Sequence, residues 1–359
     1  MKINGNILVT GGAGFIGSNF IHYIFKKSGF TGKLINIDKL TYAGNLENLT
    51  DISEQYNQER YFFHQVDICD YAELEKIFQQ YNPQVVVHFA AESHVDRSIH
   101  GPKEFIETNI TGTFNLLEIA RKQWKDRQDV LFHHISTDEV YGSLGETGFF
   151  YETTPYSPRN PYSASKASSD HLVSSYFHTF NMPITISNCS NNYGPYQFPE
   201  KLIPLMISNI VEEKSLPVYG DGKNIRDWLY VEDHCSGIWK IINNGTRGET
   251  YNIGGENEWE NIKLLHVLIE SVAQKTGKDL DSILKLITYV KDRAGHDRRY
   301  AINCDKIKHE LGWEQSVDFA EGLSKTVDWY LNNSEWIENI KTGDYQLWLD
   351  KNYGTKEKE

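Results

Sequence analysis

Residues Ile7 to Gly17 read ILVTGGAGFIG, an apolar run followed at once by glycines spaced as GxxGxxG. The apolar run predicts a short buried strand, and Gly14 to Lys27 predicts the helix that follows it. Gly11 permits a tight turn, Gly14 lets the backbone approach a ligand closely, and Gly17 lets the helix pack against the strand. A helix that begins here directs unpaired N–H groups at that ligand, so the stretch predicts a phosphate-binding loop.

Strands and helices continue to alternate after this loop. The expected strands are Leu34–Asp38, Tyr61–Val66, Val85–Ala90 and Val130–Ser136, and the expected helices are Tyr71–Tyr81 and Phe105–Lys122. Alternation of this kind is typical of right-handed βαβ units. The sequence therefore predicts an α/β fold with a Rossmann-type doubly wound parallel sheet, covered by helices on both faces.

An acidic residue ends the second predicted strand. Asp38 lies about 20 residues after the glycine loop, where a carboxylate binds adenine-ribose hydroxyls and repels a 2′-phosphate. We therefore predict NAD, and not NADP, as the cofactor. Asp67 follows the third strand, where it either reaches the adenine or caps the helix Tyr71–Tyr81. Small residues in Phe89–Ala91 end the fourth strand and leave room for a cofactor.

Composition excludes several other classes of protein. The chain has 359 residues and a formal net charge of -13, which disfavours binding to nucleic-acid phosphates. Its four cysteines lie far apart and form no CxxC pair, which suits a reducing compartment and argues against a structural zinc site. Apolar runs such as Val85 to Ala91 are too short to cross a bilayer. We expect a cytoplasmic protein with no membrane partner.

The alternation breaks after about residue 190, where prolines become frequent and Leu264–Gln274 and Ala320–Leu331 read as amphipathic helices. We expect residues 1–190 to form the NAD-binding Rossmann domain with the catalytic residues. Residues 191–350 are expected to form mainly a smaller C-terminal α/β substrate-binding lobe, with some segments returning to the Rossmann sheet, and residues 351–359 a frayed tail.

Two neighbouring motifs carry redox and acid–base chemistry. Tyr162 and Lys166 are one helical turn apart, so the ammonium is expected to lower the pKa of the phenol and to bind a ribose. Thr137, at the end of the preceding strand, can share a substrate oxygen with Tyr162. Asp138 and Glu139 follow it, and one carboxyl can serve as acid and the other as base. The alternative is that this pair only caps the following turn.

These motifs resemble those of the extended short-chain dehydrogenase/reductase family, and within it the dTDP-glucose 4,6-dehydratases. The matching stretches are TGGAGFIGSNF, NIDKLTYAGNLENL, FAAESHVDRSI, ISTDEVYG, NPYSASKASSDHLV, NCSNNYGPYQFPEKLIP, GDGKNIRDWLYVEDHC, YNIGG, DRAGHDRRYAI and LGW. The glycine loop and YxxxK are typical of the superfamily, whereas STDEVYG and SHVDRS are more specific.

The resemblance implies that Tyr162 takes the proton of the sugar 4-hydroxyl while NAD+ oxidises carbon 4. Glu139 then removes the carbon 5 proton, Asp138 protonates the departing carbon 6 hydroxyl, and the hydride returns to carbon 6. The expected reaction converts dTDP-glucose to dTDP-4-keto-6-deoxyglucose, an intermediate of deoxysugars such as dTDP-rhamnose. The family also implies a homodimer, for which Phe105–Lys122 and Ser165–Phe180 are the candidate contact helices.

The resemblance also implies which residues bind the cofactor and the substrate. The glycine loop and the ends of the predicted strands add further cofactor-binding residues. The predicted cofactor residues are Gly11, Gly14, Phe15, Ile16, Gly17, Asp38, Lys39, Leu40, Thr41, Asp67, Ile68, Phe89, Ala90, Ala91, Ser93, Thr108, Tyr162, Lys166 and Asn192. The predicted substrate residues are Ser93, Thr137, Asn191, Lys201, Leu202, Pro217, Val218, Tyr219, Arg226, Asn261, Arg293 and His296. Arg226 and Arg293 suit the diphosphate as forked donors, although a surface salt bridge is the simpler role for either.

Some features depart from the family pattern or favour other roles. Ala294, Trp259 and Arg159 stand where the family usually has other residues, with Arg159 expected near the cofactor side. His133 and His134 are adjacent on a strand and point to opposite faces, so we predict no metal site. A UDP-sugar epimerase or decarboxylase of the same fold, or an NAD-holding redox sensor, are the alternatives. An epimerase does not need the acid–base pair, and a redox sensor does not need Tyr162 and Lys166.

Overall fold

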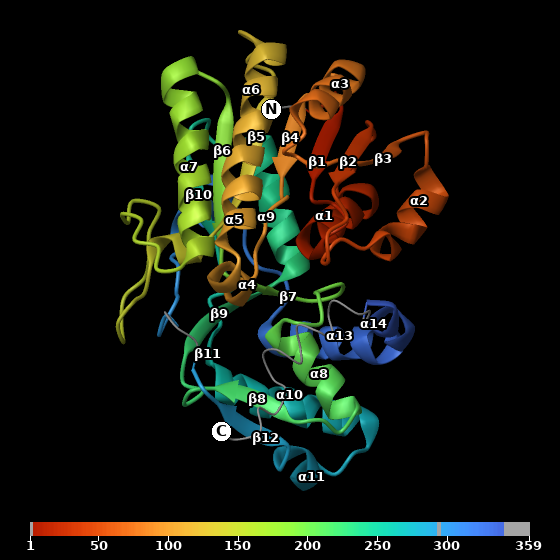
Figure 1. Ribbon diagram of the computed structural model, residues 1–359, viewed down its shortest axis with the longest axis vertical. Helices are drawn as coiled ribbons and strands as arrows, with labels where there is room; N and C mark the ends of the chain where they lie inside the picture. Colours follow the sequence, from red (N-terminus) through yellow and green to blue (C-terminus); the bar gives the residue numbers. More distant parts are fainter. Residues whose placement is uncertain (1–2, 293–295, 341–359) are drawn as a thin grey trace.

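The computed structural model describes residues 3–292 and 296–340. Within them, seven strands form one sheet in the order β10-β6-β5-β4-β1-β2-β3, and every pairing in it is parallel (Figure 1). The strands are β1 (Ile7–Thr10), β2 (Leu34–Asp38), β3 (Tyr61–Gln65), β4 (Val85–His88), β5 (Leu131–Thr137), β6 (Ile184–Cys189) and β10 (Thr250–Ile253). The predicted Rossmann-type sheet is confirmed. Because β4 ends at His88, the stretch from Phe89 onward is loop rather than strand.

The sheet is buried on both faces because its side chains alternate. Ile7 and Val9 pack with residues of α1 (Phe15–Lys26) and α9 (Val231–Asn244). Leu8 between them packs on the opposite side, with residues of α3 (Tyr71–Tyr81), α6 (Thr113–Trp124) and α7 (Pro161–Phe180). A period of two puts neighbouring strand residues on opposite faces, so an uninterrupted apolar strand is covered by two helical layers.

The long helix expected at Phe105–Lys122 is in fact composite. It consists of α5 (Pro102–Phe105), a π-helical segment η2 (Ile106–Gly112) and α6. The predicted start is one turn late, because Pro102 occupies the first helical position, where a missing N–H costs nothing. In the π-helical segment, the Asn109 side chain accepts a hydrogen bond from the Glu92 N–H and donates one to the Glu92 carbonyl. These two bonds fix the loop that follows β4. Hydrophobic periodicity does not reveal such a segment.

A smaller lobe lies at one end of the sheet (Figure 1). Its strands are β7 (Asn191–Tyr193), β8 (Leu216–Tyr219), β9 (Ile225–Tyr230), β11 (Glu258–Glu260) and β12 (Ile287–Val290). Its helices are α8 (Leu202–Val211), α10 (Asn261–Thr276), α11 (Leu280–Leu284), α13 (Phe319–Asn332) and α14 (Ser334–Ile340), around a hydrophobic core of their own. The expected amphipathic helices are α10 and α13.

Shorter elements complete the description. They are η1 (Leu46–Leu49), α2 (Thr50–Tyr56), α4 (Val95–His100), η3 (Asp138–Tyr141) and α12 (Asp305–Leu311). In the described ranges, none of the helices has the length and apolar character required to cross a membrane. The tail predicted at 351–359 lies outside the described residues.

Candidate active site

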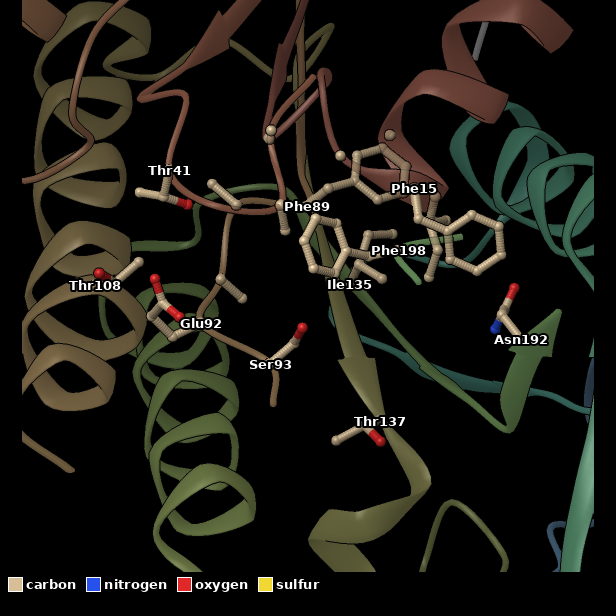
Figure 2. A pocket seen from close by; sticks show the side chains of 18 of the residues that line it. Phe15, Thr41, Phe89, Glu92, Ser93, Thr108, Ile135, Thr137, Asn192 and Phe198 are labelled. Atoms are coloured by element: carbon tan, nitrogen blue, oxygen red, sulfur yellow. The ribbon is translucent and has the colours of Figure 1, made fainter. Parts of the chain in front are cut away.

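The carboxyl ends of β1, β2, β4 and β5 meet around a cavity of about 320 Å³. Figure 2 shows Thr137 on the strand that carries Ile135, with Ser93 and Thr108 on the other side of the cavity. Every residue predicted to bind the cofactor lines this cavity except Leu40. Ligands of open α/β sheets bind at this edge.

The glycine loop leaves no room for side chains where the backbone segments meet. Gly11 has a φ of 70°, and a Cβ there would lie 2.6 Å from the Ala90 nitrogen. A Cβ on Gly17 would lie 2.2 Å from the Gly11 carbonyl oxygen. A Cβ on Gly14 would meet only that same oxygen, at 3.3 Å, so the loop is open in front of the N-terminus of α1. This open cradle fits a pyrophosphate.

Asp38 ends β2 and is held by the loop that faces it. Its carboxylate accepts hydrogen bonds from the Ala13 N–H at 3.0 Å and the Leu40 N–H at 2.8 Å. Burial raises its pKa, while these two backbone donors oppose the shift. Leu40, which does not line the cavity, thus fixes the carboxylate through its backbone. Asp38 is in place for ribose hydroxyls, and its charge disfavours an additional phosphate.

Asp67 lies in the cavity and does not cap α3. The cap is Asp70, whose side chain accepts from the Glu73 N–H. Asp67 instead forms an ion pair of 2.7 Å with Lys39, and the pKa of Asp67 is lowered mainly by its hydrogen bond to Lys39, against the opposing effect of burial. The helix-cap alternative for Asp67 is therefore wrong.

Thr137, Tyr162 and Lys166 all line the same cavity. The pKa of Tyr162 is raised well above its usual value by burial and by the Glu139 carboxylate, and the Thr137 hydroxyl opposes this only in part. Lys166 donates to the Ile135 carbonyl at 2.8 Å and lies 3.3 Å from Nε2 of His134. Burial therefore dominates the pKa of Tyr162 in this structure, and the lowering of that pKa by Lys166 stays a prediction.

Asp138 and Glu139 differ in their surroundings. Asp138 is 2% exposed, and its Oδ2 has no hydrogen-bond partner among the described residues. Its pKa is raised well above the usual value by burial, then by the Glu139 and Asp227 carboxylates. The cap of the following turn is Thr137, whose hydroxyl accepts from the Glu139 N–H. The capping alternative for the pair is therefore wrong, and Asp138 is poised to hold a proton.

A second cavity, of about 190 Å³, adjoins the first and shares Ser93, Glu139, Asn191, Asn192 and Lys201 with it. The predicted substrate residues that line it are Ser93, Asn191, Lys201, Leu202, Pro217, Val218, Tyr219, Arg226, Asn261 and His296. Thr137 lines the first cavity instead, and Arg293 lies outside the described residues. Glu139 therefore faces both cavities.

Arg226 is buried and does not lie on the surface. It is 8% exposed, its guanidinium donates to the Ile225 and Asp297 carbonyls, and it stacks over the Tyr300 ring at 4.4 Å. These contacts hold a planar, permanently charged fork in the wall of the second cavity. The group is suited to bind an anion there.

The unusual residues fall away from the reacting groups. Arg159 lies 3.7 Å from Asp297, which lines the second cavity, so the prediction that it sits on the cofactor side is wrong. Trp259 stacks on Phe319 in the core of the smaller lobe. Ala294 lies outside the described residues. As predicted, His133 and His134 point apart: His133 contacts Thr185, and His134 contacts Lys166.

Sequence reasoning missed several residues that line the cavities. Glu92 and Glu200 line the first, and Glu200, 4% exposed, pairs with Arg97 at 3.2 Å. His94 and Asp96 line the second. Asp96 lies in the short helix α4 and the other three lie outside helices and strands, so hydrophobic periodicity gives no signal for them. The one signal for Glu200 in the sequence is its position in QFPEKLIP, where charged residues stand in an otherwise apolar stretch flanked by prolines.

Comparison with known proteins agrees with this geometry. A family model described as GDP-mannose 4,6 dehydratase matches residues 8–326. The dTDP-glucose 4,6-dehydratase of Salmonella typhimurium is 54% identical over 361 residues, covering 97% of this chain and 98% of that protein.

Two solved structures are similar over nearly the whole chain. The dTDP-glucose 4,6-dehydratase of Bacillus anthracis in complex with NAD is 47% identical, with a TM-score of 0.83, over 94% of this chain and 100% of that one. The Streptomyces venezuelae enzyme with NAD and dTDP bound is 42% identical, with a TM-score of 0.86, over the same shares. The chain belongs to the family of dTDP-glucose 4,6-dehydratases.

Proposed function

We propose that the protein is an NAD-dependent hydro-lyase that converts dTDP-glucose to dTDP-4-keto-6-deoxyglucose and water. The observation that carries the proposal is that Glu139 lines both cavities, while Asp138 and Tyr162 line the first. A sugar that reaches from the second cavity into the first meets an alcohol-oxidising set and an acid–base pair at once. Transient oxidation at carbon 4 makes the carbon 5 proton acidic, and elimination across carbons 5 and 6 follows.

The first cavity has the form that NAD requires. The glycine cradle would hold its pyrophosphate, Asp38 its adenine ribose, and Lys166 its nicotinamide ribose. When bound, NAD+ accepts the hydride from carbon 4 and returns it to carbon 6, and its positive ring favours the ionised form of an adjacent phenol. That last effect opposes the burial that raises the pKa of Tyr162.

Tyr162 and Thr137 act on the 4-hydroxyl. Tyr162 takes its proton as base, and the Thr137 hydroxyl shares the same oxygen and holds it in line. When the hydride returns to carbon 6, carbon 5 takes back a proton from Glu139, and carbon 4 stays a ketone. Tyr162 then holds the proton of the former 4-hydroxyl and Asp138 lacks the one that left with water, so Tyr162 releases a proton to solvent and Asp138 takes one up before the next turnover.

Asp138 and Glu139 divide the elimination between them. Burial and the neighbouring carboxylates raise the pKa of Asp138 and so favour its protonated form, which can protonate the departing carbon 6 hydroxyl. Glu139, which lines both cavities, removes the carbon 5 proton. Two adjacent carboxyls in different surroundings thus take opposite roles. This division supports a dehydratase over an epimerase, which does not need an acid–base pair.

The smaller lobe binds the nucleotide. Arg226 would bind the diphosphate, and Lys201 lies where the two cavities meet. The division into a cofactor domain and a substrate lobe follows the two cavities. It is not a clean cut at residue 190, since α9 and β10 return to the large sheet.

The protein is further proposed to be a cytoplasmic homodimer. All four cysteines are free, as in proteins of reducing compartments. The composite helix and α7 expose Ile106, Phe114 and Phe180, with exposed fractions of 55%, 44% and 48%. Such side chains favour burial against a second copy. Sedimentation as a monomer at micromolar concentration would contradict this assembly.

Incubation with dTDP-glucose in deuterated water tests the reaction. The expected product has lost one water by mass spectrometry and carries one solvent deuterium at carbon 5, because the proton removed there exchanges with solvent before protonation. UDP-galactose and UDP-glucuronate, incubated in parallel, test the epimerase and decarboxylase alternatives. Turnover of either, with dTDP-glucose left intact, would overturn the proposal.

A further inference from the structure

Asp170 and His134, two buried ionisable side chains beside Lys166, have no role in the proposed mechanism. Asp170 follows Lys166 by one turn on α7, and His134 lies opposite them on β5. Asp170 is 2% exposed, Lys166 4% and His134 0%. A buried carboxyl of this kind is costly unless it is paired, so its partners indicate its role.

The three side chains are in contact. Nε2 of His134 lies 3.3 Å from Nζ of Lys166 and 3.2 Å from Oδ1 of Asp170. Because both distances end at the same nitrogen, the ammonium and the carboxylate are at most about 6.5 Å apart. The other oxygen of Asp170 accepts the Ser136 hydroxyl at 2.7 Å, directly before Thr137 in the chain. Asp170 therefore contacts the supports of both Lys166 and Thr137.

The charges in this group favour a cationic Lys166. Burial lowers the pKa of Lys166, and Asp170 is the main group that opposes this loss. Burial and the nearby ammonium lower the pKa of His134 well below its usual range, so the imidazole is neutral and adds no competing positive charge. Burial raises the pKa of Asp170 to about 6, which leaves the carboxylate ionised at neutral pH. The other titratable groups that face Asp170 are Tyr141, Tyr156 and His171.

We propose that Asp170 is a positioning residue that, together with His134, keeps Lys166 charged and fixed in the wall of the first cavity. Lys166 needs its charge to bind the nicotinamide ribose and to favour the Tyr162 phenolate. Lys166 and Asp170 are both buried, so the attraction between their charges is only weakly screened. This inference rests on the proposed function for its kinetic consequence, but the charge of Lys166 is a property of the protein alone.

The kinetic experiment compares pH profiles of kcat/KM for dTDP-glucose. Asp170→Asn keeps the shape of the side chain and an oxygen for Ser136 but removes the charge. At the largest separation of about 6.5 Å and an effective dielectric constant of about 20, losing that charge lowers the pKa of Lys166 by about two pH units. The alkaline limit of activity should move to lower pH by that amount. Tyr156→Phe, which removes a neighbouring hydroxyl and keeps the carboxylate, should leave the alkaline limit in place. A coincident alkaline limit in wild type and Asp170→Asn would overturn the proposal.

A second measurement needs no turnover. In protein labelled with ¹³C at lysine Cε, the Lys166 resonance is identified by its loss in Lys166→Arg and followed by NMR across the pH range. In the wild type it should show a small inflection near pH 6, where Asp170 titrates, and the inflection should vanish in Asp170→Asn or, if that variant does not fold, Asp170→Ser. If the Lys166 resonance of the wild type shows no inflection near pH 6, the inference is refuted. Absence of dTDP-glucose turnover in the wild type would instead refute the proposed function and leave this measurement decisive.

Discussion

Asp138→Asn separates the elimination from the oxidation. Asp138 is 2% exposed, and its pKa is raised well above the usual value by burial and by Glu139 and Asp227. Asparagine has nearly the same shape and still offers an oxygen to the Thr137 hydroxyl, which lies 3.3 Å from Oδ1 of Asp138. It has no proton of suitable acidity to give to a departing hydroxyl. The substitution therefore removes one chemical function and little packing.

The expected loss is that of a general acid. Such catalysis contributes about 10²- to 10⁴-fold, which corresponds to about 3–5 kcal/mol of transition-state stabilisation. The loss should appear in kcat and not in the binding of dTDP, because Asp138 lines the first cavity and Arg226 the second. Oxidation at carbon 4 should continue, because Tyr162 and Thr137 are unchanged.

A single-turnover experiment measures the two steps apart. Enzyme in excess is mixed with dTDP-glucose; the absorbance of reduced cofactor reports oxidation, and mass spectrometry of quenched samples reports water loss. In Asp138→Asn the reduced cofactor should form and persist while water loss becomes slow. The matched control is Asp221→Asn, the same chemical change at an exposed residue paired with Arg298, which should behave as wild type. Water loss in Asp138→Asn within about threefold of wild type would refute the assignment of the acid.

The same variant tests the electrostatics through stability. Because the pKa of Asp138 is higher in the folded than in the unfolded protein, folding takes up a proton between the usual pKa of 3.8 and the raised pKa of the folded protein. Stability therefore falls as pH rises through that window. Asp138→Asn should unfold at a higher temperature than wild type at neutral pH, and the difference should shrink below about pH 4. An equal or lower midpoint at neutral pH would contradict the buried-acid interpretation.

Three further substitutions test the cavities separately. Gly17→Ala places a Cβ 2.2 Å from a loop carbonyl and should cost about 1–3 kcal/mol of stability and most of the NAD affinity, by thermal unfolding and calorimetry. Gly145→Ala, where a Cβ would meet nothing within 4 Å, is its control and should be neutral in both. Asp38→Ala should reduce the preference for NAD over NADP, measured as the ratio of the two dissociation constants, and an unchanged ratio would contradict its role. Arg226→Lys keeps the charge but not the fork, and should weaken dTDP binding about tenfold with NAD binding intact; equal losses for both ligands would contradict the division.

Local pattern was sufficient for the sheet and the glycine loop. The strand Leu34–Asp38 and the helix Tyr71–Tyr81 occur with the predicted bounds, because apolar runs and helical periodicity reflect burial directly. The sequence predicted a regular helix over Phe105–Lys122. It could not reveal the π-helical segment, because that segment depends on the contacts that Asn109 and Gly112 make in the folded protein. A Cβ on Gly112 would lie 2.4 Å from Ile68, a residue far away in the chain.

The candidate site could be predicted in its residue types and not in its electrostatics. Residue spacing placed Thr137, Asp138 and Glu139 side by side, but only the fold buries Asp138 against Asp227 and so distinguishes acid from base. Spacing also placed Lys166 one turn from Tyr162, yet the fold directs its ammonium to Ile135 and His134. No pattern in the sequence pointed to Asp170, because His134 and Ser136, which it contacts, lie on β5 and not on its own helix.

The sequence by itself determined the strand–loop–helix at Gly11 to Gly17, the preference for NAD at Asp38 and the set of reacting side chains, because each follows from residues adjacent or one turn apart. Only the tertiary structure decided which carboxyl keeps a proton, which contacts hold Lys166, and where Arg226 points. Those properties depend on burial and on charges brought together from distant segments, and neither can be read from local spacing.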